Sequence, residues 1–462
     1  MTLIKSISGI RGTIGGRAGD ALTPMDIVRY TSAYCHIMQR EMGKASIKIV
    51  VGRDARISGA MVSSLMSQTL SAMGASVINL GLSTTPSVEV AVKDLNADGG
   101  IIITASHNPV QWNALKLLNS KGEFISAELG QELLAIADSN EVVYSDVFHL
   151  GKIEEHDFLG RHLQLILSLP MVDKEAIAKA GFKVGVDAVN SSGSIYVPAL
   201  LKALGVNDIE IVHGDTSGNF AHNPEPLPEH LKDLGNLVTS KHCTLGIAVD
   251  PDVDRLALVC EDGSAFGEEY TLVAVADYVL SNRKGNTVSN LSSSRALRDV
   301  TVQHGGQYCA AAVGEVNVVK KMKETNAVIG GEGNGGVIFP DAHYGRDALA
   351  GIALFLSHLA RKKMSMTALR NQYPKYEIVK EKLELDPSVA IDEILEKVIA
   401  QFPEAEVNTI DGVKLDFAEG WVHLRKSNTE PIVRVIAEHR TREDAQALAT
   451  SVMHTVKKIL AV

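Results

Sequence analysis

The sequence predicts an α/β protein with three related domains, each built on a mixed α/β sheet, and a C-terminal α+β domain. Short runs of β-branched residues alternate with longer segments of helical period, and glycines separate them, as is typical of parallel βαβ units. This order recurs three times at a spacing of about 100 residues, which indicates repeated domains rather than one large sheet. The pattern changes after Gln372, where helices and strands mix without that alternation.

The expected elements follow the chain in order through four domains, residues 1–153, 154–255, 256–368 and 369–462. The first domain is expected to contain strands 47–52, 76–80 and 100–103 and helix 59–73. A connecting helix is expected at 151–170, before strands 182–186, 209–212 and 245–249 and helix 195–204 of the second domain. The third domain is expected to contain strands 287–291 and 327–329 and helix 295–304. The fourth is expected to contain helices 391–401 and 442–460 and strands 420–424 and 432–438.

Length and composition are those of a folded, multidomain enzyme. The chain has 462 residues, of which 45% are hydrophobic and 22% charged, enough for several buried cores at about 150 residues per domain. Its 45 basic and 55 acidic residues give a formal net charge of −10, which is the wrong sign for a chain that coats nucleic acid or an anionic membrane. Attraction to an anionic ligand must therefore be local.

The sequence also predicts a cytoplasmic protein. The N-terminal segment has no basic stretch followed by an apolar core, so we expect no signal peptide, and the apolar runs are shorter than the roughly 18 residues of a spanning helix. The cysteines, Cys35, Cys243, Cys260 and Cys309, lie far apart. This spacing fits neither a zinc knuckle nor a dense disulfide framework, so we expect reduced and mostly buried thiols.

Two motifs directly follow predicted strands, where open α/β sheets place their ligands. In the first, Thr-Ala-Ser-His-Asn-Pro at 104–109, the hydroxyl of Ser106 is a competent phosphoryl carrier, although the segment could also be a polar turn ended by proline. In the second, 250–255, the alternating carboxylates of Asp250, Asp252 and Asp254 suit Mg²⁺. An EF-hand is excluded because Arg255 stands where that loop needs glycine. A solvated acidic turn is the remaining alternative.

Two further motifs suit a phosphorylated sugar. The glycine-rich segment 330–336 lets the backbone approach a ligand, and Glu332 and Asn334 supply groups that hydrogen-bond hydroxyls; the alternative is a flexible turn. In the segment 425–431, the side chains of Arg425, Ser427, Asn428 and Thr429, with Arg434 close behind, can donate to a phosphate. A polar hairpin turn would explain the small residues but not the flanking arginines.

Together and in this order, the four motifs resemble those of the α-D-phosphohexomutase family, over essentially the whole chain. The resemblance implies that Ser106 is the phosphoserine and that Asp250, Asp252 and Asp254 hold one Mg²⁺ per chain, with a phosphoserine oxygen as a further ligand. It implies that 331–336 is the sugar loop and that the four domains are arranged around a central cleft. The residues implied to bind the non-reacting phosphate are Arg425, Ser427, Asn428 and Thr429. The family's residues near the phosphoserine and its early arginine match Asn113, Lys116 and Arg11.

The family's mechanism is implied with these residues. Phosphorylated Ser106 would donate its phosphoryl group to a hexose monophosphate, and the resulting hexose 1,6-bisphosphate, which also serves as activator, would turn over and return its other phosphate. Mg²⁺, Arg11, Lys116 and Arg255 would offset the charge of the transferring group. Lys116 is also a candidate for proton transfer, and His107 of the serine motif is grouped with these catalytic residues.

The preferred sugar is the open question. Asn334 and Gly336 replace the family's usual serine and histidine, and Glu315 stands where many members have a cationic pair, changes that are similar to the archaeal-type branch. Glu315 favours the ammonium group of glucosamine phosphate, with mannose or glucose phosphate as the alternative, although it could equally be a helix N-terminal residue. His343 is expected on an ordinary loop surface, with replacement of the missing histidine as the other option.

Two other functional classes stay open from sequence, namely a serine-dependent metal phosphatase and a non-catalytic phosphosugar-binding protein. The phosphatase needs the serine and the carboxylates but no distant phosphate site. We expect a phosphorylated hexose as substrate, no nucleic-acid or membrane partner, and a monomer or homodimer.

Overall fold

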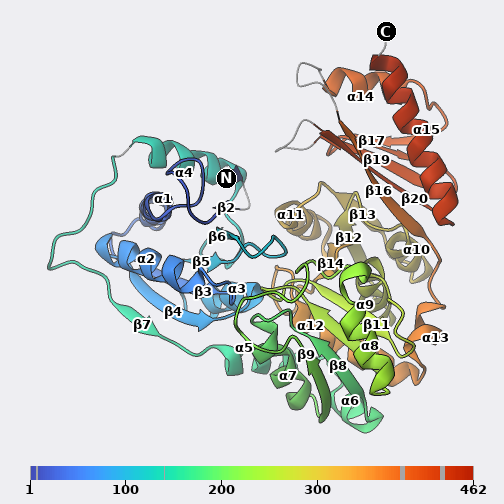
Figure 1. The fold of residues 1–462 in the computed structure, drawn as a ribbon, viewed down its shortest axis with the longest axis horizontal. Helices are drawn as coiled ribbons and strands as arrows, with labels where there is room; N and C mark the ends of the chain where they lie inside the picture. The colour runs from blue at the N-terminus through green and yellow to red at the C-terminus, as the bar shows by residue number, and fades with distance from the viewer. Residues whose placement is uncertain (1, 7–8, 140, 385–390, 427–431, 461–462) are drawn as a thin grey trace. The chain divides into compact units, whose positions relative to one another are not determined.

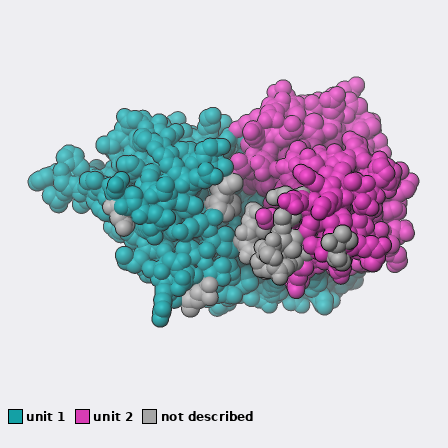
Figure 2. All heavy atoms as spheres, turned by 90° about the horizontal axis from the view of Figure 1, so that it is seen from above, with its two compact units in different colours: residues 1–271, 335–369 teal, residues 272–334, 370–462 magenta. Residues whose placement is uncertain are grey.

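A computed structural model describes residues 2–6, 9–139, 141–384, 391–426 and 432–460 of the chain. The chain divides into two compact units, which Figure 2 colours separately. Unit 1 comprises residues 1–271 and 335–369, and unit 2 comprises residues 272–334 and 370–462. Within the described residues, the fold contains four sheets, of seven, four, four and five strands.

The first sheet has the order β1-β2-β6-β5-β3-β4-β7. Its strands are β1 (Leu3–Ser6), β2 (Gly9–Thr13), β3 (Lys48–Arg53), β4 (Ser76–Leu82), β5 (Gly99–Ile103), β6 (Trp112–Leu118) and β7 (Ile153–Glu155). The helices that accompany it are α1 (Pro24–Met42), α2 (Gly59–Ala72), α3 (Thr85–Asp94), α4 (Ala127–Ser139) and α5 (Leu159–Ser168) (Figure 1). Strand β3 is parallel to β4 and β5, whereas β6 is antiparallel to β5.

Helices cover both faces of this sheet because successive side chains of a strand point to opposite faces. Ile49 and Val51 of β3 pack into one core cluster with α1, α2 and α4. Val50, between them, packs into a second cluster with α3. All three valine and isoleucine side chains are completely buried, which explains why β3 reads as a continuous apolar run.

The next two sheets repeat the strand order of the first. They run β11-β10-β8-β9 and β13-β12-β14-β15, and the matching part of the first sheet is β6-β5-β3-β4. The strands are β8 (Lys183–Asp187), β9 (Asp208–Val212), β10 (Leu245–Val249), β11 (Leu256–Cys260), β12 (Asn286–Asn290), β13 (Tyr308–Ala311), β14 (Ala327–Glu332) and β15 (Gly336–Ile338). The helices are α6 (Lys174–Ala180), α7 (Gly193–Ala203), η1 (Pro228–His230), α8 (Lys232–Ser240), α9 (Glu268–Asn282), α10 (Ala296–Gln303), α11 (Glu315–Thr325), α12 (Ala348–Lys362) and α13 (Met366–Arg370). This shared order confirms the predicted internal repeat.

The C-terminal part is α+β, as expected. Its sheet has the order β16-β20-β19-β18-β17, with every neighbouring pair antiparallel. Its elements are β16 (Glu377–Glu384), α14 (Ile391–Ile399), β17 (Glu406–Asn408), β18 (Val413–Asp416), β19 (Trp421–Lys426), β20 (Ile432–His439) and α15 (Arg442–Leu460). The two helices and the sheet share one apolar core.

Two sequence expectations about local structure were wrong in part. The expected connecting helix at 151–170 is a short strand, β7, followed by α5, because Ile153 to Glu155 pair with the edge strand β4 and satisfy its backbone groups. The glycine-rich segment begins within β14 rather than after it, so only residues 333–335 form the turn before β15.

The burial of the thiols agrees with the sequence analysis. The four cysteines are outside any disulfide, and Cys35, Cys243 and Cys260 are buried while Cys309 is partly exposed. Among the described residues, every helix is too short or too polar to cross a membrane.

Within unit 2, Arg295 connects α10 to the C-terminal sheet. Its side chain, 4% exposed, donates to the carbonyl oxygens of Phe417, Ala418 and Gly420 at 2.8–2.9 Å and forms an ion pair with Asp416. The turn between β18 and β19 is therefore held by one guanidinium group.

We expect Arg295→Met to lower the free energy of unfolding by about 3 kcal/mol, because one buried and two part-buried carbonyl oxygens and the Asp416 carboxylate lose their donor. Arg298→Met is the matched control, since Arg298 contacts the same Asp416 from a 38% exposed position and an exposed pair contributes less than about 1 kcal/mol. Urea denaturation of the full chain measures both variants. Equal losses would show that the buried hydrogen bonds do not hold this junction.

Candidate active site

Ser106 lies in the loop that follows β5 at the carboxyl end of the first sheet. It is 8% exposed, and its φ of +47° lies in the left-handed region, which a non-glycine residue adopts only when its surroundings enforce it. The Thr104 hydroxyl accepts from the Ser106 amide at 2.9 Å and donates to Asp54 at 2.6 Å. These bonds help to hold Ser106 in that conformation.

Arg56 holds the same loop from the other side. Its buried guanidinium donates to the carbonyl oxygens of Ser106 and Asn108, both at 2.6 Å, and to those of Pro109 and Trp112 at 2.8 and 2.9 Å. Asp54 pairs with it at 3.1 Å. Sequence reasoning missed Asp54 and Arg56, although a charged run directly after a buried strand is the same signal that identified the other motifs.

The three carboxylates of the 250–255 turn lie together between the antiparallel strands β10 and β11. Asp250, Asp252 and Asp254 are fully buried, and each offers an oxygen within 4.8 Å of the others. Asp250 Oδ1 accepts from the Asp254 and Arg255 amides at 3.1 Å, and Val253 takes a φ of +61° to close the turn. Their burial is incompatible with the solvated acidic turn that the sequence left open.

This turn and the Ser106 loop meet directly. The Ser106 hydroxyl donates to Asp250 Oδ2 at 2.7 Å. Asp252 Oδ1 and Asp254 Oδ1 are buried and have no hydrogen-bond partner among the described residues. Unpartnered carboxylate oxygens beside a hydroxyl are the ligands that a hard divalent cation prefers, so the residues present fit a magnesium ion.

Nearly buried cations partly balance these carboxylates. Lys116 Nζ of β6 lies 2.7 Å from Asp252 and 3.4 Å from Asp254, and Arg346 donates to Asp254 at 2.7 Å. Burial alone would lower the pKa of Lys116, but the two carboxylates raise it above its usual value. Burial and the neighbouring Asp254 and Asp252 together raise the pKa of Asp250. Sequence reasoning missed Arg346.

The other predicted residues of unit 1 lie around this centre, with one exception. Arg11 of β2 donates to Asn108 at 3.3 Å, and Arg255 donates to Glu225 at 3.2 Å. Burial and the nearby Arg255, Arg346 and Arg11 lower the pKa of His107 to about 2, so its ring is neutral, with Nδ1 3.4 Å from Ser106 Oγ. Asn113 is fully buried and donates to Ser58 instead.

The predicted residues of unit 2 form two groups, one near Gly314 and the start of α11 and the other on strands β19 and β20. Buried Glu332 accepts from Asn290 at 2.9 Å and from the Gly314 amide at 3.2 Å, while Glu315, also buried, is the first residue of α11. Asn334 is partly exposed at the turn after β14. Arg425 lies opposite Arg434 in the β19–β20 register. Ser427, Asn428 and Thr429 lie outside the described residues.

Asp411 links the two groups within unit 2. Its carboxylate accepts from Arg425 Nε at 2.9–3.0 Å and from the Val313 amide at 2.9 Å. The loop before Glu315 and the predicted phosphate-binding arginine are therefore attached to one carboxylate. Sequence reasoning missed Asp411, which lies in a polar turn without a recognisable motif.

Comparison with protein-family models matches four successive stretches of the chain. Residues 3–143, 161–263 and 267–376 match the alpha/beta/alpha domains I, II and III of phosphoglucomutase/phosphomannomutase, and residues 384–455 match its C-terminal domain. The chain belongs to this family. It is an isomerase, because its relatives are mutases.

Individual relatives of this mutase carry two kinds of name. The chain is 35% identical to a phosphoglucomutase/phosphomannomutase of Thermococcus kodakarensis, over 94% of this chain and 95% of the relative. It is 32% identical to a phosphoglucosamine/phosphogalactosamine mutase of Sulfurisphaera tokodaii, over 98% of both. A solved phosphoglucomutase/phosphomannomutase family protein of Burkholderia thailandensis is 27% identical with a TM-score of 0.85, covering 98% of this chain and 97% of that one.

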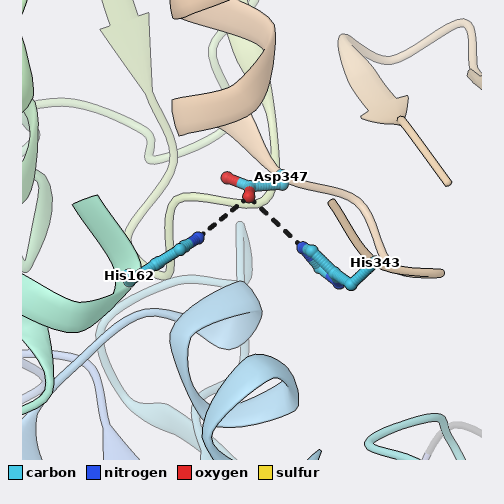
Figure 3. A group of neighbouring side chains, drawn as sticks. All are labelled: His162, His343 and Asp347. Atoms are coloured by element: carbon cyan, nitrogen blue, oxygen red, sulfur yellow. Dashed lines mark hydrogen bonds and ion pairs between the residues drawn. The ribbon is translucent and has the colours of Figure 1, made fainter. Parts of the chain in front are cut away.

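His343 of the mutase is not on an ordinary loop surface. It lies in a nearly buried cluster with Asp347 and His162 (Figure 3). His343 Nε2 is 3.2 Å from Asp347 Oδ2, and His162 Nε2 is 3.1 Å from the same oxygen. His343 Nδ1 is 3.3 Å from Glu89 of α3, so carboxylates face both of its nitrogens. Burial alone would lower the pKa of His343, but the bonds to Asp347 and Glu89 raise it to about 10.

We expect the stabilising contribution of His343 to depend on pH. Because the folded pKa of about 10 exceeds the ordinary value of 6.5, the contribution is complete below pH 6.5 and is lost as the pH rises through about 10. His343→Gln should therefore cost most near pH 6, by up to about 5 kcal/mol at about 1.4 kcal/mol per pKa unit. The measurement is urea unfolding of both proteins between pH 6 and 10, with exposed His454→Gln as control. A cost that does not change with pH would contradict it.

Proposed function

We propose that this mutase interconverts hexose 6-phosphate and hexose 1-phosphate through phosphorylated Ser106 and a hexose 1,6-bisphosphate. The observation that carries the proposal is the hydrogen bond from the Ser106 hydroxyl to Asp250, within a buried group of three carboxylates. Arg56 and Asp54 fix the backbone of the serine loop. A hydroxyl held in this way suits an in-line phosphoryl transfer, because catalysis of that reaction depends mainly on positioning the reacting groups and stabilising their charge.

In this proposal, Asp250, Asp252 and Asp254 would hold one Mg²⁺. When bound, this ion would neutralise part of the charge of the phosphoryl group. The chain's own cations do the rest. Lys116 enters as an ammonium ion because its pKa is raised, so it offsets charge and has a proton to give as the bond to Ser106 breaks. Arg11 and Arg255 contribute fixed positive charge. His107 stays neutral and serves to orient the serine.

Arg425 and Arg434 are proposed to bind the phosphate that does not react, together with Ser427, Asn428 and Thr429. Arg425 is supported by the bond from its Nε to Asp411, which orients the guanidinium so that its terminal NH₂ groups can donate to a phosphate. Asn113, Glu332 and Asn334 are proposed to act on the sugar, either directly or by holding the loops that contact it. Hexose 1,6-bisphosphate is the proposed activator.

Glucosamine phosphate is the proposed substrate. Two buried carboxylates lie next to Gly314: Glu315 follows it in the sequence, and Glu332 accepts a hydrogen bond from its amide. A negative environment of this kind favours a substrate ammonium group. The name of the Sulfurisphaera relative supports the amino sugar. The name of the Thermococcus relative supports the alternative, mannose or glucose phosphate.

Replacing the proposed phosphoserine tests the mechanism. Ser106→Ala should lower interconversion by about a thousandfold or more, because the covalent route is lost, while exposed Ser168→Ala should behave as wild type. Product analysis with Mg²⁺ and hexose bisphosphate measures the isomer and inorganic phosphate together. Retained isomer formation in Ser106→Ala would contradict the proposal, and stoichiometric inorganic phosphate from the wild type would favour the phosphatase instead.

A turnover panel tests the sugar. With the 1-phosphates of glucose, mannose, glucosamine and N-acetylglucosamine, the wild type should prefer glucosamine 1-phosphate. Glu315→Gln should lower the ratio of glucosamine to glucose phosphate turnover about tenfold, because an ammonium group loses a charged acceptor. Exposed Glu324→Gln on the same helix is the control. An unchanged ratio would exclude Glu315 as the determinant and leave the neutral sugars.

A further inference from the structure

A second group of potential metal ligands lies at the carboxyl end of the second sheet, apart from the three aspartates. Asp187 is the last residue of β8, His213 directly follows β9, and His222 lies in the segment after it. Their ligand atoms lie within 4.8 Å of one another. The Asp187 side chain is 1% exposed, while those of His213 and His222 are 17% and 15% exposed. The group is therefore almost buried yet open to solvent on the histidine side.

The hydrogen bonds of the two rings point to a cation. His213 Nδ1 and His222 Nε2 face the same oxygen, Asp187 Oδ2, at 3.2 and 3.0 Å. The opposite nitrogens also face acceptors, since His222 Nδ1 lies 2.7 Å from the Asn223 carbonyl oxygen and His213 Nε2 lies 3.4 Å from Asp233. A neutral imidazole has only one N–H, so in each ring one nitrogen lone pair faces an oxygen unless a cation lies between them.

Protonation of both rings would give every ring nitrogen an N–H to donate, but only at an electrostatic cost. Both imidazolium ions would then share one carboxylate oxygen with their ring centroids 5.2 Å apart, and like charges at that distance disfavour each other. One divalent ion replaces both protons and is bound by all three side chains at once.

The arrangement has the features of a histidine-rich metal site. Metal-bound histidines almost always donate their other N–H to a carboxylate or a carbonyl oxygen, which is what Asp233 and Asn223 provide. Ligands bound at about 2.0–2.1 Å in tetrahedral geometry are about 3.4 Å apart, close to the 3.0 and 3.2 Å found here. Imidazole nitrogens favour zinc-like ions over magnesium.

We propose that Asp187, His213 and His222 bind one divalent transition-metal ion of the Zn²⁺ class, with a fourth position open to water. The site is distinct in its ligands from the Asp250, Asp252 and Asp254 group and does not depend on the proposed function.

The proposed ion would tie the 213–225 segment to the second sheet. This segment ends at Glu225, which accepts from Arg255 at 3.2 Å, and Arg255 directly follows the aspartate turn. Asn190, at the turn after β8, donates to Asp215 of the same segment at 3.0 Å. An ion at His213 and His222 therefore has a structural role, which is to fix the segment that orients Arg255.

Metal titration of the full chain tests this site. The protein is freed of metal with a chelator and saturated with Mg²⁺ to occupy the aspartate turn, and Zn²⁺ is then added in a calorimeter. We expect one Zn²⁺ per chain and a rise in Tm on binding. Co²⁺ in place of Zn²⁺ should show the intense visible absorption of a tetrahedral complex.

Variants distinguish this site from adventitious binding. His213→Gln and His222→Gln should each weaken Zn²⁺ binding by more than about 100-fold, and Asp233→Asn, which removes only the negative charge of the acceptor that faces a bound ring, by about 10-fold. His149→Gln is the control, because exposed His149 pairs with a carboxylate without a second histidine. Asp233→Asn leaves all three ligands in place, so its Zn²⁺ affinity tests the site even if a histidine variant folds poorly. Absence of Zn²⁺ binding in the wild type, or wild-type affinity in His222→Gln, would overturn the proposal.

Discussion

The structure of unit 1 depends on burying three carboxylates within 4.8 Å of one another. At such a separation, two like charges repel by about 3.5 kcal/mol for an effective dielectric constant of 20, so the aspartate turn needs cations from elsewhere in the chain. Lys116 comes from the first sheet and Arg346 from the segment before α12. The charge balance of the site thus requires that these separate parts of unit 1 pack together, which couples the fold to the chemistry.

Much of the fold could be predicted because its signals are local. Buried parallel strands read as continuous apolar runs, and glycine marked where helices stop, so β3, α2 and β10 were placed to within two residues. The same is true of α15. The short strand β7 could not be predicted, because three residues carry too little periodicity and their conformation is set by the edge of β4.

The site was predictable to the extent that its residues lie in motifs. Ser106 and the three aspartates were found in this way, and the structure brings them into contact. Arg346 and Asp411 could not be found, because neither lies in a motif and each contacts a residue more than 90 positions away. His343 was misjudged because one of its two carboxylate partners, Glu89, is far from it in the sequence, on α3.

The repeated strand order has a consequence for where chemistry is located in such a chain. In each of the three related sheets, the third strand of the repeat, β5, β10 or β14, is followed directly by a motif: the serine loop, the aspartate turn or the glycine-rich turn. Each motif then leads into the fourth strand of its sheet. The connection between the third and fourth strands thus occupies the same place in all three sheets but has different residues in each. A newly duplicated copy of the domain would therefore acquire a function most directly by changing the few residues of that connection, while the connections after the first and second strands stay free to vary in length.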